Sequence, residues 1–379
     1  MSTPRRSSPP LRSPEQRRGD PAALTIAPLA LVTTTALPDR PAVRRDLRAA
    51  TRRPRRRRRL VVGGLVLALV AAFAIRVLLG DYTFTVPDFF RILFGEQLPV
   101  STFILMESKL PRAVLAVLVG LALGSAGSLF QMLLRNPLAS PDIVGVSLGA
   151  SAAGIFALLT LGLRDGAVSA FAVVGAVVVS AVVRWVAGTT GGYRLVLTGV
   201  GVAAAMVSVV QYLLARSNTW DVQLALRWLV GSLNNVPWST IGLLAVSLAV
   251  LLPTLAVMSR SLEVLELGDE AAAGLGVGRH RTDALLLVGV LLTAVAVAAA
   301  GPVAFVAFMS GPIARALMGG RHSLLAGALV GAVLVLLADY AAAYLVPGVV
   351  LPVGIVTGAV GGPFLLWLLA RGAATGRTG

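Results

Sequence analysis

The sequence predicts an all-α protein that crosses a membrane many times. Of its 379 residues, 56% are hydrophobic and only 13% are charged, and the mean hydropathy is +0.85. These values lie far from those of soluble domains. The apolar residues also gather in runs of about 20, the length with which an α-helix crosses the hydrocarbon of a bilayer. By that criterion we expect about ten spans, at residues 60–80, 112–134, 143–162, 167–187, 194–215, 239–258, 283–300, 303–318, 324–343 and 352–370.

The first 59 residues differ from the rest of the chain. They hold 16 arginines and four acidic residues, and therefore +12 of the formal net charge of +16. This segment is rich in Pro, Arg and Ser and lacks the apolar periodicity that a core requires, which predicts a disordered tail. The run from Arg52 to Arg59 directly precedes the first apolar segment, which predicts a cytoplasmic N-terminus beside anionic lipid. The basic charge therefore needs no nucleic acid partner.

An even number of spans predicts that both termini lie on the cytoplasmic side, with residues 372–379 as a short C-terminal tail. This topology is supported by the arginines, which are enriched in the connections that it places on the cytoplasmic side. In the region 283–318 we expect two helices that share one apolar stretch, broken at Gly301-Pro302.

Two outer connections carry aromatic residues. The segment PDFFRILFG within the loop 81–111 predicts a short helix at the membrane interface. In the loop 216–238, Trp220, Trp228 and Trp238 are typical of interface anchors.

A polar corner follows the second predicted span. This span carries small residues at Gly120, Gly124, Ser125, Gly127 and Ser128, which favours the close approach of another helix. The sequence RNPLASP then breaks the helix with two prolines before the next apolar run. A polar, irregular segment between two spans is tolerated only outside the hydrocarbon or where it lines a protein cavity, which predicts a gate or a cytoplasmic corner.

The inner loop 259–282 contains four acidic residues followed by AAAGLG. We expect a short helix from about Asp269 to Leu275, because acids favour the first turn, alanines propagate it and Gly276 can adopt the left-handed cap. Such a helix is suited to the groove of another protein. The alternative is a solvated loop that only links two spans.

Several chemistries are not supported by the composition. The chain has no cysteine and only two histidines, which excludes thiolate metal sites and a histidine cage. No GxxxxGK[ST] motif and no paired carboxylates occur, so we expect neither an ATPase nor a membrane enzyme, and no directly bound cofactor or metal.

Asp339 is the acid expected inside the hydrocarbon, with a structural role in pairing or capping weighed against substrate or proton handling. Arg76 is the other candidate, and we expect its long side chain to snorkel to the interface. An ion-coupled secondary transporter would require more such residues.

Four motifs together resemble one family. They are LPRAVLAVLVGLALGSAG, RNPLASPDIVGVSLGA, LELGDEAAAGLGV and LPVGIVTGAVGGPFLLWLL, in this order. They resemble the FecCD family, the permease subunits of bacterial ABC importers for ferric siderophores, haem and cobalamin. The resemblance implies a cobalamin-permease-like fold of the type II importers over residues 60–371. It also implies a second permease copy or paralogue, cytoplasmic ABC ATPases and an external substrate-binding protein.

The resemblance also implies a cargo. GPVAFVAF and Gly311-Pro312 before Ile313-Ala314-Arg315 are nearer the ferric-siderophore permeases. We therefore expect a ferric siderophore, with haem or cobalamin as the alternatives.

Residue roles follow from the same resemblance. In relatives a short cytoplasmic helix seats in the ATPase, which here implies Gly268, Asp269, Glu270, Ala273, Leu275 and Gly276. The inner gate corresponds to Asn136 and Leu138, and a second gate segment to Gly192 and Tyr193. Basic residues that dock the binding protein correspond to Lys109 and Arg112. An arginine that is common four residues after Asp339 is replaced here by Ala343, so one docking salt bridge is expected to be missing or supplied by another subunit.

Overall fold

The computed structural model describes the backbone of residues 40–188 and 192–375, and the side chains of residues 56–188, 194–268 and 270–371. All regular elements within these ranges are helical. Contacts divide the chain into two units, residues 1–54 and residues 55–379, and the second unit contains every apolar span.

Eight helical segments of the described chain are long and apolar enough to cross a membrane. They are Arg56–Leu78 within α1 (Arg40–Leu78), Pro99–Leu133, α6 (Gly166–Ala187), Arg194–Ala215 within α7 (Gly192–Ala215), α9 (Trp238–Leu265), α11 (Arg279–Ala300), α13 (Leu324–Tyr344) and Val353–Arg371 within α14 (Val353–Thr375). Two shorter apolar helices, α5 (Val146–Leu159) and α12 (Val306–Leu317), occupy the other two predicted positions. These two contain fewer residues than the length criterion assumes.

Helix limits differ from the prediction at several places. Helix α1 begins at Arg40, within the segment 1–59 predicted to be disordered, and residues 1–39 lie outside the described residues. The predicted loop 81–111 is largely helical, with α2 (Val86–Leu93), α3 (Pro99–Phe103) and a π-helical turn (Ile104–Lys109) leading into α4 (Leu110–Leu133). Pro99 suits a first helical position, because its missing N–H is not needed there.

The region 283–318 forms two helices. Helix α11 ends at Ala300, Gly301 follows with φ +71°, and α12 begins at Val306. A Cβ on Gly301 would lie 2.4 Å from the carbonyl oxygen of Trp228, so a side chain cannot fit at this break. The predicted break at Gly301-Pro302 is therefore confirmed.

Helix α4 lies at the centre of the second unit and packs against α9, α11, α12 and α13. Its contact with α13 is unusually close. A Cβ on Gly120 would lie 2.4 Å from the Cα of Ala332, and a Cβ on Gly124 would lie 2.3 Å from the carbonyl oxygen of Gly327. The prediction that small residues admit a close neighbour is thus confirmed for this pair of helices.

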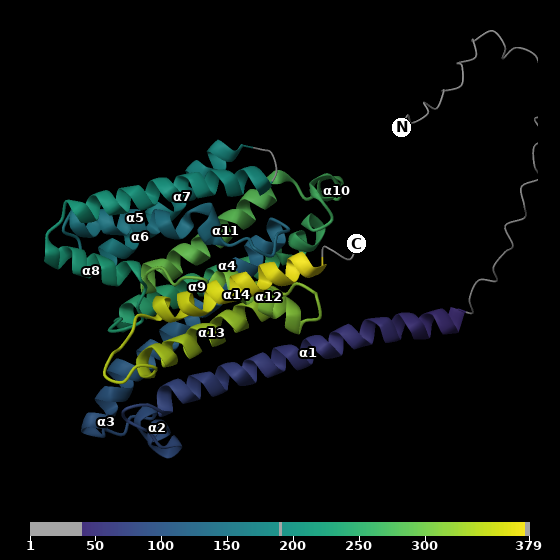
Figure 1. The fold of residues 1–379 in the computed structure, drawn as a ribbon. Coiled ribbons are helices and arrows are strands. Elements are labelled where there is room, and N and C mark those ends of the chain that lie inside the picture. The colour runs from purple at the N-terminus through teal and green to yellow at the C-terminus, as the bar shows by residue number, and fades with distance from the viewer. Residues whose placement is uncertain (1–39, 189–191, 376–379) are drawn as a thin grey trace, which may run out of the picture. The chain divides into compact units, whose positions relative to one another are not determined.

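The two ends of the helix bundle carry different segments (Figure 1). One end holds α2, α3 and α8 (Thr219–Leu229), and the other holds α10 (Asp269–Gly274). Of the three tryptophans predicted to anchor the interface, Trp220 is 84% exposed. Trp228 instead packs its ring against the backbone at Gly154, so a side chain on that glycine would clash with it.

Candidate functional site

The polar corner between α4 and α5 has a defined turn structure. After α4, the side-chain oxygen of Asn136 accepts a hydrogen bond of 2.9 Å from the backbone N–H of Leu138, which fixes a tight turn. Pro141 then begins a single 3₁₀ turn, η3 (Pro141–Val144), and Gly145 with φ +81° leads into α5. The predicted break in the helix is confirmed.

A cavity of about 860 Å³ lies beside this corner. Its walls come from the corner and α5, the end of α8, the α11–α12 connection, α12 and α14. The lining residues are Leu138, Ser140, Asp142, Ile143, Ser147, Leu148, Ser151, Leu229, Val230, Pro302, Val303, Ala304, Phe305, Phe308, Gly354, Ile355, Gly358 and Leu365. A volume in this range accommodates a ligand of drug size or larger.

The cavity has one polar wall and several apolar ones. Its polar side chains, Ser140, Asp142, Ser147 and Ser151, all belong to the corner and to the first two turns of α5. The Ser147 hydroxyl donates to the Asp142 carboxylate, and the Ser151 hydroxyl donates to the Ser147 carbonyl at 2.8 Å. Among the described residues, no group of three His, Cys, Asp or Glu side chains could hold a metal ion. The wall can exchange hydrogen bonds with a passing molecule, but it carries no arrangement for covalent chemistry.

An aromatic pair forms part of the apolar wall. Phe305 has φ +62°, a left-handed conformation that is strained for a bulky residue and costs about 1–3 kcal/mol. Its ring packs against α14, where a Cβ on Gly361 would lie 2.2 Å from the ring, and it meets the Phe308 ring edge-on at 6.2 Å. Sequence reasoning missed both aromatic residues. The Gly301-Pro302 pair just before them, which breaks the helix, was the local signal that this segment could line a site.

The predicted coupling helix is present. Helix α10 spans Asp269–Gly274, Leu275 follows it, and Gly276 has φ +81°, as the predicted left-handed cap requires. Ala272 is fully buried and holds the helix against the core, whereas Leu275 is 64% exposed. Glu270, Ala273 and Gly276 are also exposed. The side chain of Asp269 lies outside the described residues.

The corner and α10 are neighbours, although more than 130 residues separate them. The position that a Cβ would take on Gly268 lies 3.6 Å from Nη1 of Arg135. The fold thus brings the Asn136 corner next to the start of α10. Gly192 and Tyr193 begin α7, but their side chains lie outside the described residues.

Asp339, near the C-terminal end of α13, is fully buried and pairs with two arginines. Its carboxylate accepts from Arg76 Nε at 2.6 Å and from Arg112 Nε at 2.7 Å. The expectation that Arg76 snorkels to the interface is wrong, because its side chain is only 4% exposed. The guanidinium group of Arg76 binds the buried Asp339 carboxylate in place of water.

The two predicted docking residues point into the chain. Lys109 is 6% exposed, donates to the carbonyl of Leu79 at 2.9 Å and to that of Tyr82, and lies 5.2 Å above the Phe84 ring. Arg112 is held by Asp339, with 12% of its side chain exposed. Their role in docking stays a prediction.

Eight helical segments long and apolar enough to cross a membrane, with a cavity that has one polar wall, indicate a polytopic membrane protein among the described residues. The chain belongs to the FecCD transport family, whose model matches residues 67–371. It is 37% identical to the ferric enterobactin transport system permease protein of Escherichia coli (strain K12), over 83% of this chain and 97% of that one. It is 40% identical to the Fe(3+) dicitrate transport system permease protein of the same organism, over 71% of this chain and 86% of that one.

The fold is similar to a solved structure described as an inward-facing conformation of a metal-chelate type ABC transporter. The TM-score is 0.72 at 26% identity, covering 82% of this chain and 99% of that one. The type II importer permease fold expected from the four motifs is therefore confirmed.

Proposed function

We propose that this chain is the transmembrane permease subunit of an ATP-driven ABC importer that carries a ferric siderophore across the cytoplasmic membrane by alternating access. The observation that carries the proposal is the cavity of about 860 Å³, whose polar wall continues into the corner beside the coupling helix. Two relatives are named for ferric enterobactin and Fe(3+) dicitrate, which supports an iron chelate as the cargo.

A second permease, either a copy or a paralogue, would complete the path. Helix α14 contributes Ile355 and Leu365 to the cavity and exposes large apolar side chains elsewhere, including Val360 and Leu366. Exposed apolar faces of this kind suit either lipid or another subunit. The external binding protein, which would deliver the chelate, belongs to the same proposal.

The energy would come from a separate ATPase on the cytoplasmic side, where both termini are proposed to lie. The coupling helix exposes the acidic Glu270 and the apolar Leu275, a small surface that a partner groove can hold. Movement of α10 would reach the Asn136 corner because Arg135 lies close to Gly268, the residue before α10. The permease itself would need no bound cofactor or metal.

Charge reversal of the coupling helix tests the proposal. Asp269→Lys combined with Glu270→Lys is expected to abolish co-purification of the partner ABC ATPase and to reduce uptake of ⁵⁵Fe-loaded chelates to background. Asp165→Lys, at an exposed position near the other end of the bundle, serves as the control and is expected to retain both. Intact ATPase binding and uptake after charge reversal would contradict the proposal.

The same assay separates the alternatives. Ferric enterobactin, Fe(3+) dicitrate and hemin are offered in parallel, so that the preferred chelate identifies the cargo class. An ATP-driven importer stops when ATP is depleted and continues with an uncoupler present. The reverse result would indicate an ion-coupled transporter.

A further inference from the structure

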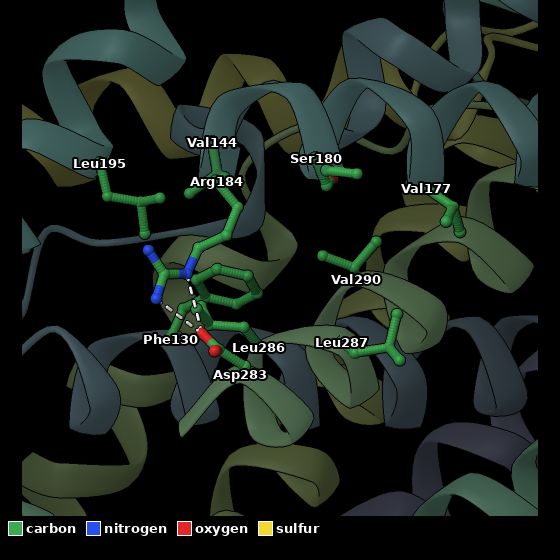
Figure 2. Close-up of a pocket in the computed structure, with 11 residues that line it drawn as sticks. Phe130, Val144, Val177, Ser180, Arg184, Leu195, Asp283, Leu286, Leu287 and Val290 are labelled. Carbon is green, nitrogen blue, oxygen red and sulfur yellow. Dashed lines mark hydrogen bonds and ion pairs between the residues drawn. The ribbon is translucent and has the colours of Figure 1, made fainter. Parts of the chain in front are cut away.

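An ion pair joins α6 to α11 at the end of the bundle that holds α10 (Figure 2). Arg184, in the last turn of α6, places Nε and Nη2 each 2.8 Å from Oδ1 of Asp283, in the first turns of α11. The other carboxylate oxygen of Asp283 lies 3.9 Å from Nε of Arg279. About a third of each partner's side chain is exposed, at 29% for Arg184 and 39% for Asp283. Pairs with such exposure contribute little to folding stability.

The ion pair borders a small cavity of about 130 Å³, on which five structural elements converge. Phe130 comes from α4. Val144 comes from η3 of the polar corner, Leu195 from the first turn of α7, Ser180 from α6 and Leu286 from α11. Figure 2 shows Leu195 and Val144 on the same side of the cavity as the guanidinium group. Unfilled volume between these elements leaves room for them to shift relative to one another.

On one side, Asp283 is linked to the coupling helix. Only four residues, 275–278, separate α10 from α11. Val277 is buried in the same core as the end of α9, and Arg281 donates to the Ser261 hydroxyl of α9 at 3.3 Å. The beginning of α11 is therefore held against the end of α9 and is separated from α10 by only a short connection.

On the other side, Arg184 lies near the start of α7. Its Nη1 donates to the carbonyl of Gly188, the C-cap of its own helix, and Leu195 from the first turn of α7 lines the same small cavity. Helix α7 in turn crosses η3 in backbone contact, because a Cβ on Gly199 would lie 2.3 Å from the carbonyl oxygen of Ile143. A shift of the start of α7 is thus passed to the polar corner.

We propose that Arg184 and Asp283 are positioning residues that make the start of α7 move together with the start of α11, and so link the coupling helix to the polar corner by a second route. This inference rests on the proposed function. The first route is the proximity of Arg135 to Gly268, on which a Cβ would lie 3.6 Å from Nη1 of Arg135. Contacts that are continuous in space do not by themselves show that two helices move together, so the coupling must be measured.

The absence of cysteine from the chain permits site-specific spin labelling. Nitroxide labels at Arg194→Cys (α7) and His280→Cys (α11), both exposed positions, report the distance between the two helix starts in the assembled complex, with and without ATP and vanadate. With the ion pair intact, we expect one narrow distance distribution that is retained in both nucleotide states. Arg184→Gln or Asp283→Asn is expected to widen it at least twofold and to lower iron-chelate uptake per ATP hydrolysed at least fivefold.

The charge swap Arg184→Asp with Asp283→Arg distinguishes positioning from folding. It restores the attraction between the helices, so we expect it to narrow the distribution again and to recover at least half of the uptake per ATP. The control is Arg91→Gln with Glu96→Gln, an exposed pair of 2.7 Å between α2 and the residues after it, which should change neither readout.

Two results would overturn the inference. One is an unchanged distance distribution in the neutralised variants, and the other is a loss of uptake that merely follows the amount of assembled complex and is not recovered by the swap. Failure of the ATPase to co-purify with the labelled parent would instead overturn the proposed function, before any variant is compared.

Discussion

Arg76 Nε lies 2.6 Å from Oδ2 of Asp339, a residue 263 positions further along the chain, and both side chains are almost completely buried. Arg112 binds the same carboxylate from α4. The three groups therefore join α1, α4 and α13 and retain one positive charge more than the carboxylate balances. An ion cluster in a low-dielectric environment depends strongly on each member, because a charge left without its partner is not solvated.

Asp339→Asn is expected to destabilise the protein more than any single change at its partners. It leaves two buried arginines without a counter-ion. Breaking a buried ion pair lowers the free energy of unfolding by about 3–5 kcal/mol. Arg76→Gln should cost less, because Arg112 still balances the carboxylate. The measurement is thermal unfolding in lipid nanodiscs, with Asp165→Asn at an exposed position as control. Equal losses from Asp339→Asn and Arg76→Gln would show that the cluster does not act as described.

Adding one methyl group between α4 and α13 is expected to separate them. In Gly124→Ala the new Cβ would lie 2.3 Å from the backbone oxygen of Gly327, and overpacking of this kind costs about 1–3 kcal/mol. Gly63→Ala is the matched control, since nothing lies within 4 Å of its Cβ position in α1 and alanine favours helices by up to about 1 kcal/mol. Unfolding temperatures should therefore change in opposite directions, and a loss in both variants would contradict the described packing.

Acidification is expected to destabilise the turn between α12 and α13 through His322. Burial lowers the pKa of His322 below its ordinary value of 6.5; Glu266 opposes this shift and Arg315 adds to it. Because the pKa of His322 is lower in the folded protein, the unfolded chain binds a proton more readily. The free energy of unfolding is therefore unaffected by this residue above pH 6.5 and decreases as the pH falls from 6.5 through the lowered pKa.

His322→Gln should remove this part of the pH dependence, measured as the difference in unfolding temperature between neutral and acidic buffer. If acidification lowers the unfolding temperature of the wild-type protein no more than that of His322→Gln, the assignment is contradicted.

Helix α2 is expected to lie in the membrane interface. Phe94 directly after it is 84% exposed and Phe90 is 47% exposed, whereas Arg91 pairs with Glu96 at 2.7 Å on the polar side. A spin label at Phe94→Cys should be protected from water-soluble relaxation agents and accessible to oxygen. A label at Glu96→Cys should show the opposite pattern. Equal access to the water-soluble agent at both positions would indicate that α2 is held in solvent.

The positions of the apolar helices could be predicted from the sequence because a lipid-facing helix must be apolar along its whole length, wherever its neighbours lie. The break at Asn136 and the short helix from Asp269 follow equally local rules, since proline ends a helix and glycine supplies the left-handed cap. The four motifs were sufficient to indicate the family for the same reason: each consists of consecutive residues.

The tertiary structure alone decided which distant residues meet. Arg76 was expected at the interface, yet it is buried against Asp339. Phe305 and Ser147 lie in motifs that indicated the family or its cargo, but their meeting in the wall of one cavity depends on packing between distant helices. Arg184 counted only as a charge that indicates topology until α6 and α11 placed it beside Asp283. Local sequence determines where a helix begins, ends and faces lipid, whereas a buried charge or a cavity depends on packing between helices that are far apart in the chain.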